Sequence, residues 1–72
     1  MPPPRYPEIR VHLHSRNPFA LVGAVRSALR HSQVDAAEIR RFTEEALQDE
    51  EPHRVRDVCA AWAEVDIDVE IA

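Results

Sequence analysis

Alternating polar and apolar residues at the two ends of the chain constrain its fold more than any other feature. The N-terminal stretch alternates Ile9, Val11 and Leu13 with Arg10, His12 and His14. The C-terminal stretch alternates Val65, Ile67, Val69 and Ile71 with Asp66, Asp68 and Glu70. Successive side chains of a strand point to opposite faces, so the pattern predicts half-buried strands over 8–14 and 65–71. Their polar faces carry opposite charge, and we therefore expect the two ends to lie side by side in one sheet.

Three amphipathic helices are predicted between these strands. Asn17 is a suitable N-cap and Pro18 a suitable first residue for the first helix, which should end before the polar exit 31–33. The apolar positions of this helix are Phe19, Leu21, Val22, Val25, Ala28 and Leu29. Gly23 lies inside it, where we expect this residue to permit close approach of another element.

The second and third helices follow from capping residues and from helical spacing. Asp35 and Glu38 have the spacing of a helix start, and the inner face that follows is Ile39, Phe42, Ala46 and Leu47. On the outer face we predict two ion pairs one turn apart, Arg40 with Glu44 and Arg41 with Glu45. The third helix should run from Pro52 to near Ala63, because Val55, Val58, Cys59 and Trp62 recur at helical spacing.

The element order predicts a small single-domain α+β fold, β-α-α-α-β, with three helices packed on one face of a two-stranded sheet. Residues 1–7 contain four prolines and predict an extended arm, whereas residues 8–72 form the domain. Three helices that reverse direction would leave the strands parallel, but one polar face is more typical of antiparallel sheets, so both directions stay open. Two copies would form a homodimer by pairing along a sheet edge, unless the acids of the second strand prevent it.

Charge and composition exclude several classes of protein. The net charge of −4 gives the chain no overall electrostatic match to nucleic acid or to anionic lipid. No apolar run approaches the roughly 20 residues that span a bilayer, and prolines stand where a signal peptide needs an apolar segment. Cys59 is the single cysteine, so no internal disulfide is expected. We expect a cytoplasmic protein with no membrane contact and no cofactor.

The sequence contains no catalytic pattern. Cys59 lies on the apolar stripe of the third helix, which is typical of a buried packing thiol. The hydroxyl residues lack the context of a nucleophile elbow, and a chain with one glycine has no glycine-rich phosphate loop. We therefore predict that the protein is not an enzyme.

Histidines and acids on the two strands are the candidates for a metal site. His12 and His14 share a strand face, and Asp66 and Asp68 would lie opposite. Their spacing matches no established zinc pattern, and surface histidines paired with carboxylates are far commoner than ligands. We predict no metal site, and a His/carboxylate metal-binding protein stays an alternative.

Arginines supply the candidates for a nucleic-acid surface. They are Arg16, Arg26, Arg30, Arg54 and Arg56, which would form a local basic patch only if the fold gathers them. No aromatic residues are interleaved with them as a stacking platform, and solvated helix faces explain arginines equally well. A nucleic-acid-binding regulator is therefore the second hypothesis.

Several short segments resemble a family of small bacterial proteins that also occur in mobile and phage-like contexts. They are Tyr6-Pro7-Glu8-Ile9, Asn17-Pro18-Phe19-Ala20 with Gly23, Ala28-Leu29-Arg30, Val34 with Glu38-Ile39, Phe42 with Glu45-Ala46, and Trp62 to Val65. The chain departs from that pattern at residues 14–16, at residues 48–51 and in the strand from Asp66 onward. The resemblance implies a fold and assigns no activity, cofactor or site residue.

The leading hypothesis for function is a non-enzymatic interaction or regulatory module. A well-specified core without catalytic equipment indicates a protein that acts by presenting a surface. We expect an unknown protein partner, with a homodimer as one form of such an interaction.

Overall fold

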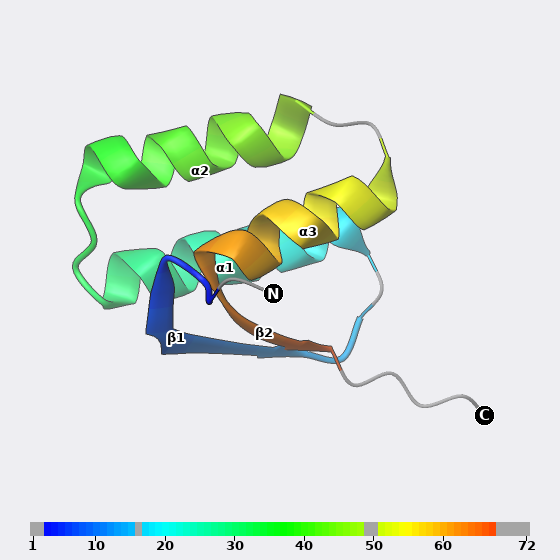
Figure 1. Cartoon of the computed structure of the whole chain (residues 1–72), viewed down its shortest axis with the longest axis horizontal. Coiled ribbons are helices and arrows are strands. Elements are labelled where there is room, and N and C mark those ends of the chain that lie inside the picture. The colour runs from blue at the N-terminus through cyan, green and yellow to red at the C-terminus, as the bar shows by residue number, and fades with distance from the viewer. Residues whose placement is uncertain (1–2, 16, 49–50, 68–72) are drawn as a thin grey trace.

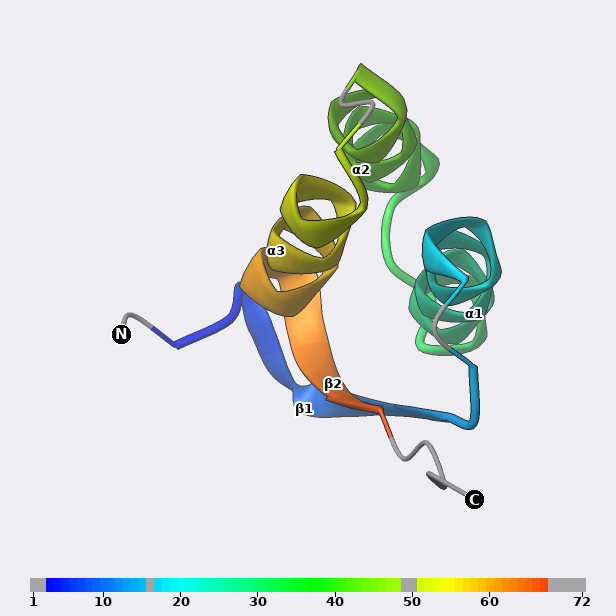
Figure 2. The ribbon, with the colours of Figure 1, turned by 90° about the vertical axis from the view of Figure 1, so that its right-hand side faces the viewer.

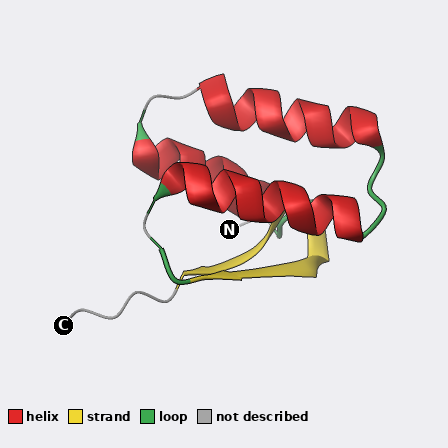
Figure 3. Cartoon of the chain, turned by 180° about the vertical axis from the view of Figure 1, so that it is seen from behind, coloured by secondary structure: helices red, strands yellow, loops and turns green. Residues whose placement is uncertain are grey.

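The residues that the structure describes form two strands and three helices, in the predicted order. The computed structural model describes residues 3–15, 17–48 and 51–67. The elements are β1 (Tyr6–Leu13), α1 (Pro18–His31), α2 (Ala36–Gln48), α3 (Pro52–Trp62) and β2 (Ala63–Ile67). Figure 3 shows the helices on one side of the sheet, which confirms the predicted α+β architecture.

The two strands are parallel neighbours, which decides the direction that the sequence leaves open. Val11 is opposite Val65, and His12 is opposite Asp66. Figure 1 shows β1 and β2 side by side beneath the helices. β1 begins at Tyr6, before the predicted start at Glu8, and β2 begins directly after α3 at Ala63. The predicted strand residues 68–71 lie outside the described residues.

β1 bends near its start. Tyr6 is opposite Ala63 and Arg10 is opposite Glu64, so three residues of β1 lie between consecutive partners on β2. Pro7 is one of them, and proline cannot donate to a ladder, which favours such an irregularity. Figure 2 shows the bend, after which the strand runs beneath α3 and α1.

The core lies between the sheet and the helices. Its members are apolar side chains with little or no exposed surface: Ile9, Val11, Leu21, Val22, Val25, Leu29, Phe42, Ala46, Val55, Cys59, Trp62 and Ala63. Trp62 joins the layers, because its ring is stacked on Tyr6 at 6.2 Å and lies edge to face with Phe42 at 5.7 Å. The helical stripes predicted from the sequence therefore supply most of this core.

Arg5 fixes the start of β1 to the helices. Its backbone N–H donates to the carbonyl of Ala61 at 2.9 Å, and its guanidinium carbon lies 5.2 Å from the ring centre of Trp62. The same guanidinium forms an ion pair with Glu38 of α2. Interactions with Tyr6 and then with Glu38 raise the pKa of Arg5 above its ordinary value. The C-terminal end of the predicted arm is thus held against α2 and α3.

The helix starts use the predicted caps. Asn17 Oδ1 accepts from the N–H of Phe19 at 3.0 Å, and Asp35 Oδ1 accepts from the N–H of Ala37 at 3.1 Å. Both side chains satisfy backbone donors that have no partner within the helix.

α1 ends in a turn that the sequence does not predict. Gln33 has φ of 61°, in the left-handed region that glycine usually occupies. Gln33 N–H donates to the carbonyl of Arg30, and Val34 N–H donates to that of Leu29, each at 3.0 Å. These are the two bonds of a Schellman motif. It turns the chain directly into α2.

Three details differ from the predictions for the helices. Phe19 and Leu47, assigned to inner faces, are 67% and 55% exposed, because both lie on faces turned away from the core, whereas Leu21 and Ala46 in the same turns are buried. A Cβ added at Gly23 would have no heavy atom within 4 Å, so no element of the described fold approaches this glycine. Their exposure leaves all three side-chain positions available to another molecule.

Candidate functional site

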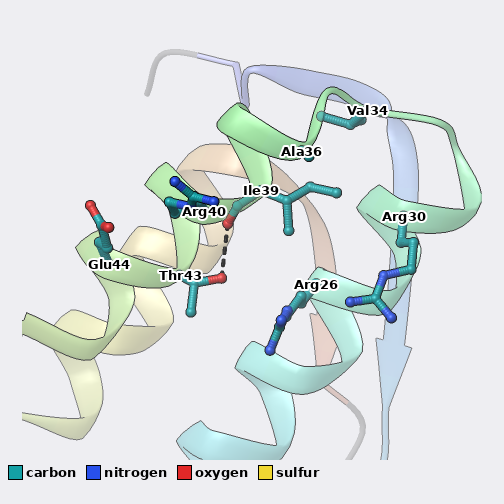
Figure 4. Close-up of a pocket in the computed structure, with 8 residues that line it drawn as sticks. All are labelled: Arg26, Arg30, Val34, Ala36, Ile39, Arg40, Thr43 and Glu44. Carbon is teal, nitrogen blue, oxygen red and sulfur yellow. Dashed lines mark hydrogen bonds between the residues drawn. The ribbon is translucent and has the colours of Figure 1, made fainter.

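A groove lies between α1 and α2, beside the turn that joins them. It has a volume of about 410 Å³ and is lined by Arg26, Arg30, Val34, Ala36, Ile39, Arg40, Thr43 and Glu44. Figure 4 shows these residues coming from α1, from α2 and from the turn between them, with α3 and the sheet behind. The groove therefore opens on the side of the helix pair that α3 does not cover.

Three arginines give this groove its charge. Arg26 and Arg30 lie one turn apart on α1, and Arg40 lies on α2. Within residues 3–15, 17–48 and 51–67, the guanidinium groups of these three arginines form no ion pair and no hydrogen bond. Among the groove-lining residues that the structure describes, Glu44 is the one acid. The groove therefore attracts anionic groups.

Among the described residues, Arg40 of α2 does not form the ion pair that the sequence pattern predicts. Arg40 was predicted to pair with Glu44, but in the described part of the chain no ion pair within 4.0 Å joins them. The companion pair, Arg41 with Glu45, is present at 4.0 Å. Exposed one-turn pairs contribute only about 0.3–0.5 kcal/mol, which is too little to hold two long side chains in one geometry. Arg40 is therefore a site residue that the sequence prediction missed.

The floor of the groove is apolar. Val34 and Ile39 are half-buried and pack against the core, so one side of each faces the groove. Thr43 Oγ1 donates to the carbonyl of Ile39 at 2.8 Å, which satisfies its hydroxyl within α2. A ligand here meets apolar surface between positive charges.

Apolar residues extend the surface beyond the arginines. Phe19, Gly23, Arg26 and Arg30 follow one another at intervals of four, three and four residues, which places them on one stripe of α1. Leu47 lies one turn after Thr43 on α2 in the same way. Figure 1 shows that α1 and α2 run in opposite directions. Phe19 is near the start of α1 and Leu47 near the end of α2, so both lie at the same end of the pair. One end of the surface is thus basic and the other apolar.

The polar face of the sheet brings together part of the predicted metal cluster. His12 Nδ1 lies 3.0 Å from Asp66 Oδ2, and the ring of His14 lies 4.8 Å from that of His12. In the part of the chain that the structure describes, no three such side chains are arranged to hold a metal ion. Asp68 lies outside the described residues. The observed contact is a surface histidine paired with a carboxylate.

The predicted nucleic-acid residues are divided among different places. Arg26 and Arg30 line the groove, whereas Arg54 and Arg56 belong to α3, which contributes no residue to the groove lining. Arg56 Nε donates to the carbonyl of Pro52 at 3.5 Å, and Arg54 also has an interaction partner. Arg16 lies outside the described residues.

Cys59 is a core thiol, as its position on the apolar stripe predicts. The side chain is fully buried, and burial raises the pKa of the thiol to about 11. A nucleophilic cysteine needs a lowered pKa and access to solvent. Cys59 has neither.

Comparisons with protein-family models, with curated proteins and with solved structures find no match to this chain. Over residues 3–15, 17–48 and 51–67, no helix has both the length and the apolar character needed to cross a bilayer.

Proposed function

We propose that this protein is a non-enzymatic interaction module whose α1–α2 groove binds an acidic segment of a partner protein. One observation carries the proposal: three arginines without a partner in the described structure surround a half-apolar groove. Arginine forms two parallel hydrogen bonds with a carboxylate, and its flat guanidinium is weakly hydrated, so it suits protein interfaces.

The apolar floor favours a protein segment over nucleic acid. Val34 and Ile39 offer contact area to aliphatic side chains, which a phosphate backbone does not supply. Single-strand binders add aromatic side chains on which bases stack, and the described groove lining contains none. The net charge of −4 also opposes long-range attraction of a polyanion. Nucleic-acid binding through the same arginines is the second candidate, because phosphates also match guanidinium groups.

The charge of the groove also opposes its use between two copies of this chain. In a two-fold dimer the same surface of both subunits meets itself, which would place Arg26, Arg30 and Arg40 against their own copies. Like charges brought together at an interface cost several kcal/mol. Pairing along a sheet edge would leave the groove open, so a homodimer of that kind is compatible with the proposal.

Selection from a random peptide library tests the proposal directly. The wild-type chain is the target, and a variant with Arg26→Ser, Arg30→Ser and Arg40→Ser is the counter-target. We expect enriched peptides that combine Asp or Glu with aliphatic residues, and a loss of about tenfold or more in their affinity for the counter-target. Circular dichroism checks that both proteins are folded.

A matched variant separates the groove from general electrostatics. Arg10→Ser, Arg41→Ser and Arg54→Ser remove the same charge from exposed positions outside the groove. This variant should bind the selected peptides nearly as well as the wild type. Failure to enrich acidic peptides, or equal losses in the two triple variants, would contradict the proposal. A salt-dependent gel shift with DNA or RNA that disappears only in the groove variant would favour the second candidate instead.

A further inference from the structure

We infer that the segment bound in the α1–α2 groove is an amphipathic helix whose backbone passes close to Gly23. This inference rests on the proposed function and specifies the secondary structure and the residue pattern of the partner. Three observations carry it: the groove lies between two helices, a glycine with open space above it lies on the groove-facing stripe, and the surface changes from basic to apolar along its length.

The walls of the groove favour a helix over an extended segment. α1 and α2 satisfy their own backbone hydrogen bonds, so the groove presents side chains and no strand edge with which a peptide backbone would pair. A bound helix satisfies its own backbone groups and inserts side chains into the groove. Figure 2 shows α3 packed on the other side of the pair, so the bound helix would lie opposite α3.

Gly23 indicates where the partner helix passes closest to α1. Glycine inside a helix costs about 1 kcal/mol relative to alanine, and no contact within the described fold requires it here, since a Cβ would meet no heavy atom within 4 Å. A residue without a Cβ lets a neighbouring backbone approach closely. Gly23 lies between Phe19 and Arg26 on the stripe that borders the groove. It therefore marks where the partner helix would cross most closely.

The order of side chains predicts the pattern of the partner. Phe19 and Arg30 are separated by 11 positions on α1, which corresponds to about 16 Å along the helix axis. A partner helix of about three turns spans this length. It should place acidic side chains opposite Arg26, Arg30 and Arg40, and aliphatic side chains opposite Phe19 and Leu47. Both sets should lie on one face at intervals of three and four residues.

The strongest peptide from the library selection, synthesised as a free peptide, is the probe for this inference. Two changes test the two parts of the inference separately. Proline in the middle of the peptide breaks a helix and so tests its conformation. Gly23→Trp in the protein fills the open space and so tests the close approach of the peptide to Gly23. We expect each change to weaken binding about tenfold or more. We also expect the bound peptide to show helical NMR shifts.

A matched variant controls for added bulk. Ala60→Trp places the same side chain at an exposed position of α3, which does not line the groove, and should leave binding unchanged. Thermal unfolding verifies that both tryptophan variants fold. A peptide that depends on the three arginines but tolerates proline and Gly23→Trp would overturn the helix inference and leave the proposed function standing. Failure to enrich any arginine-dependent peptide would overturn both.

Discussion

His12 of β1 and Asp66 of β2 face each other across the parallel strands, with 3.0 Å between Nδ1 and Oδ2. These residues come from opposite ends of the chain. Their contact shows that the two charged strand faces predicted from the sequence are neighbours. The pair lies on the outer face of the sheet, where both side chains are at least half exposed.

Because of this exposure, the pair should contribute little to stability. We expect Asp66→Asn to change the free energy of unfolding by less than about 1 kcal/mol, since water and salt screen exposed pairs. Val65→Ala, one position away and partly buried against the core, should cost at least about 1 kcal/mol. Urea denaturation measures both values. A larger loss for Asp66→Asn than for Val65→Ala would show that the charged pair, rather than apolar packing, holds β2.

Truncation of the two phenylalanines should change the stability of the fold by very different amounts. Phe42 is fully buried against Trp62, and Phe42→Ala should cost about 3–5 kcal/mol, a large part of the stability of a domain of this size. Phe19 is 67% exposed, and Phe19→Ala should change stability by about 0.5 kcal/mol or less. Thermal unfolding followed by circular dichroism compares them. Equal losses would mean that Phe19 is packed in solution.

The end of α1 offers a stabilising substitution. Gln33 has φ of 61°, and Gln33→Gly removes the steric cost of that conformation, so we expect a gain of about 0.5–1 kcal/mol. Ser32→Gly is the matched control, because Ser32 has φ of −87° and glycine there only adds freedom to the unfolded chain. In chemical denaturation, the free energy of unfolding of Gln33→Gly should be higher than that of the wild type, and that of Ser32→Gly should be equal or lower. The reverse order would contradict the Schellman geometry.

The buried thiol predicts a specific response to alkaline pH. The pKa of Cys59 is about 11 in the fold against an ordinary value of 9.0, so between these values the unfolded chain loses its proton while the folded chain keeps it. Ionisation then favours unfolding, and stability should fall by about 1–3 kcal/mol across this window. Cys59→Ala should lack this part of the decline. Rapid reaction of the native thiol with Ellman's reagent at pH 8 would contradict the burial.

Local patterns in the sequence predicted most of the fold. Asn17 and Asp35 determine helix starts through hydrogen bonds within two residues, and Pro18 favours the first helical position through its fixed φ. The spacing of Val55, Cys59 and Trp62 determines a buried face. These features act locally, so they are readable without a structure. The boundaries of the strands were less accurate, because β1 begins before Pro7 and β2 follows α3 without a loop. Both depend on pairing between distant parts of the chain.

Only part of the candidate site could be predicted from the sequence, because the site depends on how distant segments pack together. Arg26 and Arg30 are among the arginines that the sequence indicates as candidates for a basic patch. Nothing local places Arg40 beside them, since that depends on how α1 packs against α2. The same applies to Gly23, whose open surroundings follow from the position of α3. Gln33 also gives no indication of its left-handed conformation, because glycine usually marks such a turn.

Chemical-shift mapping on the protein, as it binds the peptide, tests the central claim that the α1–α2 groove is the binding surface. The isotope-labelled chain is titrated with the strongest library peptide, and amide shifts are followed residue by residue. We predict that the largest changes fall on Gly23, Arg26, Arg30, Ile39 and Arg40, and that the outer face of the sheet around His12 is unaffected. Shifts concentrated on the strands, with α1 and α2 unchanged, would contradict the account.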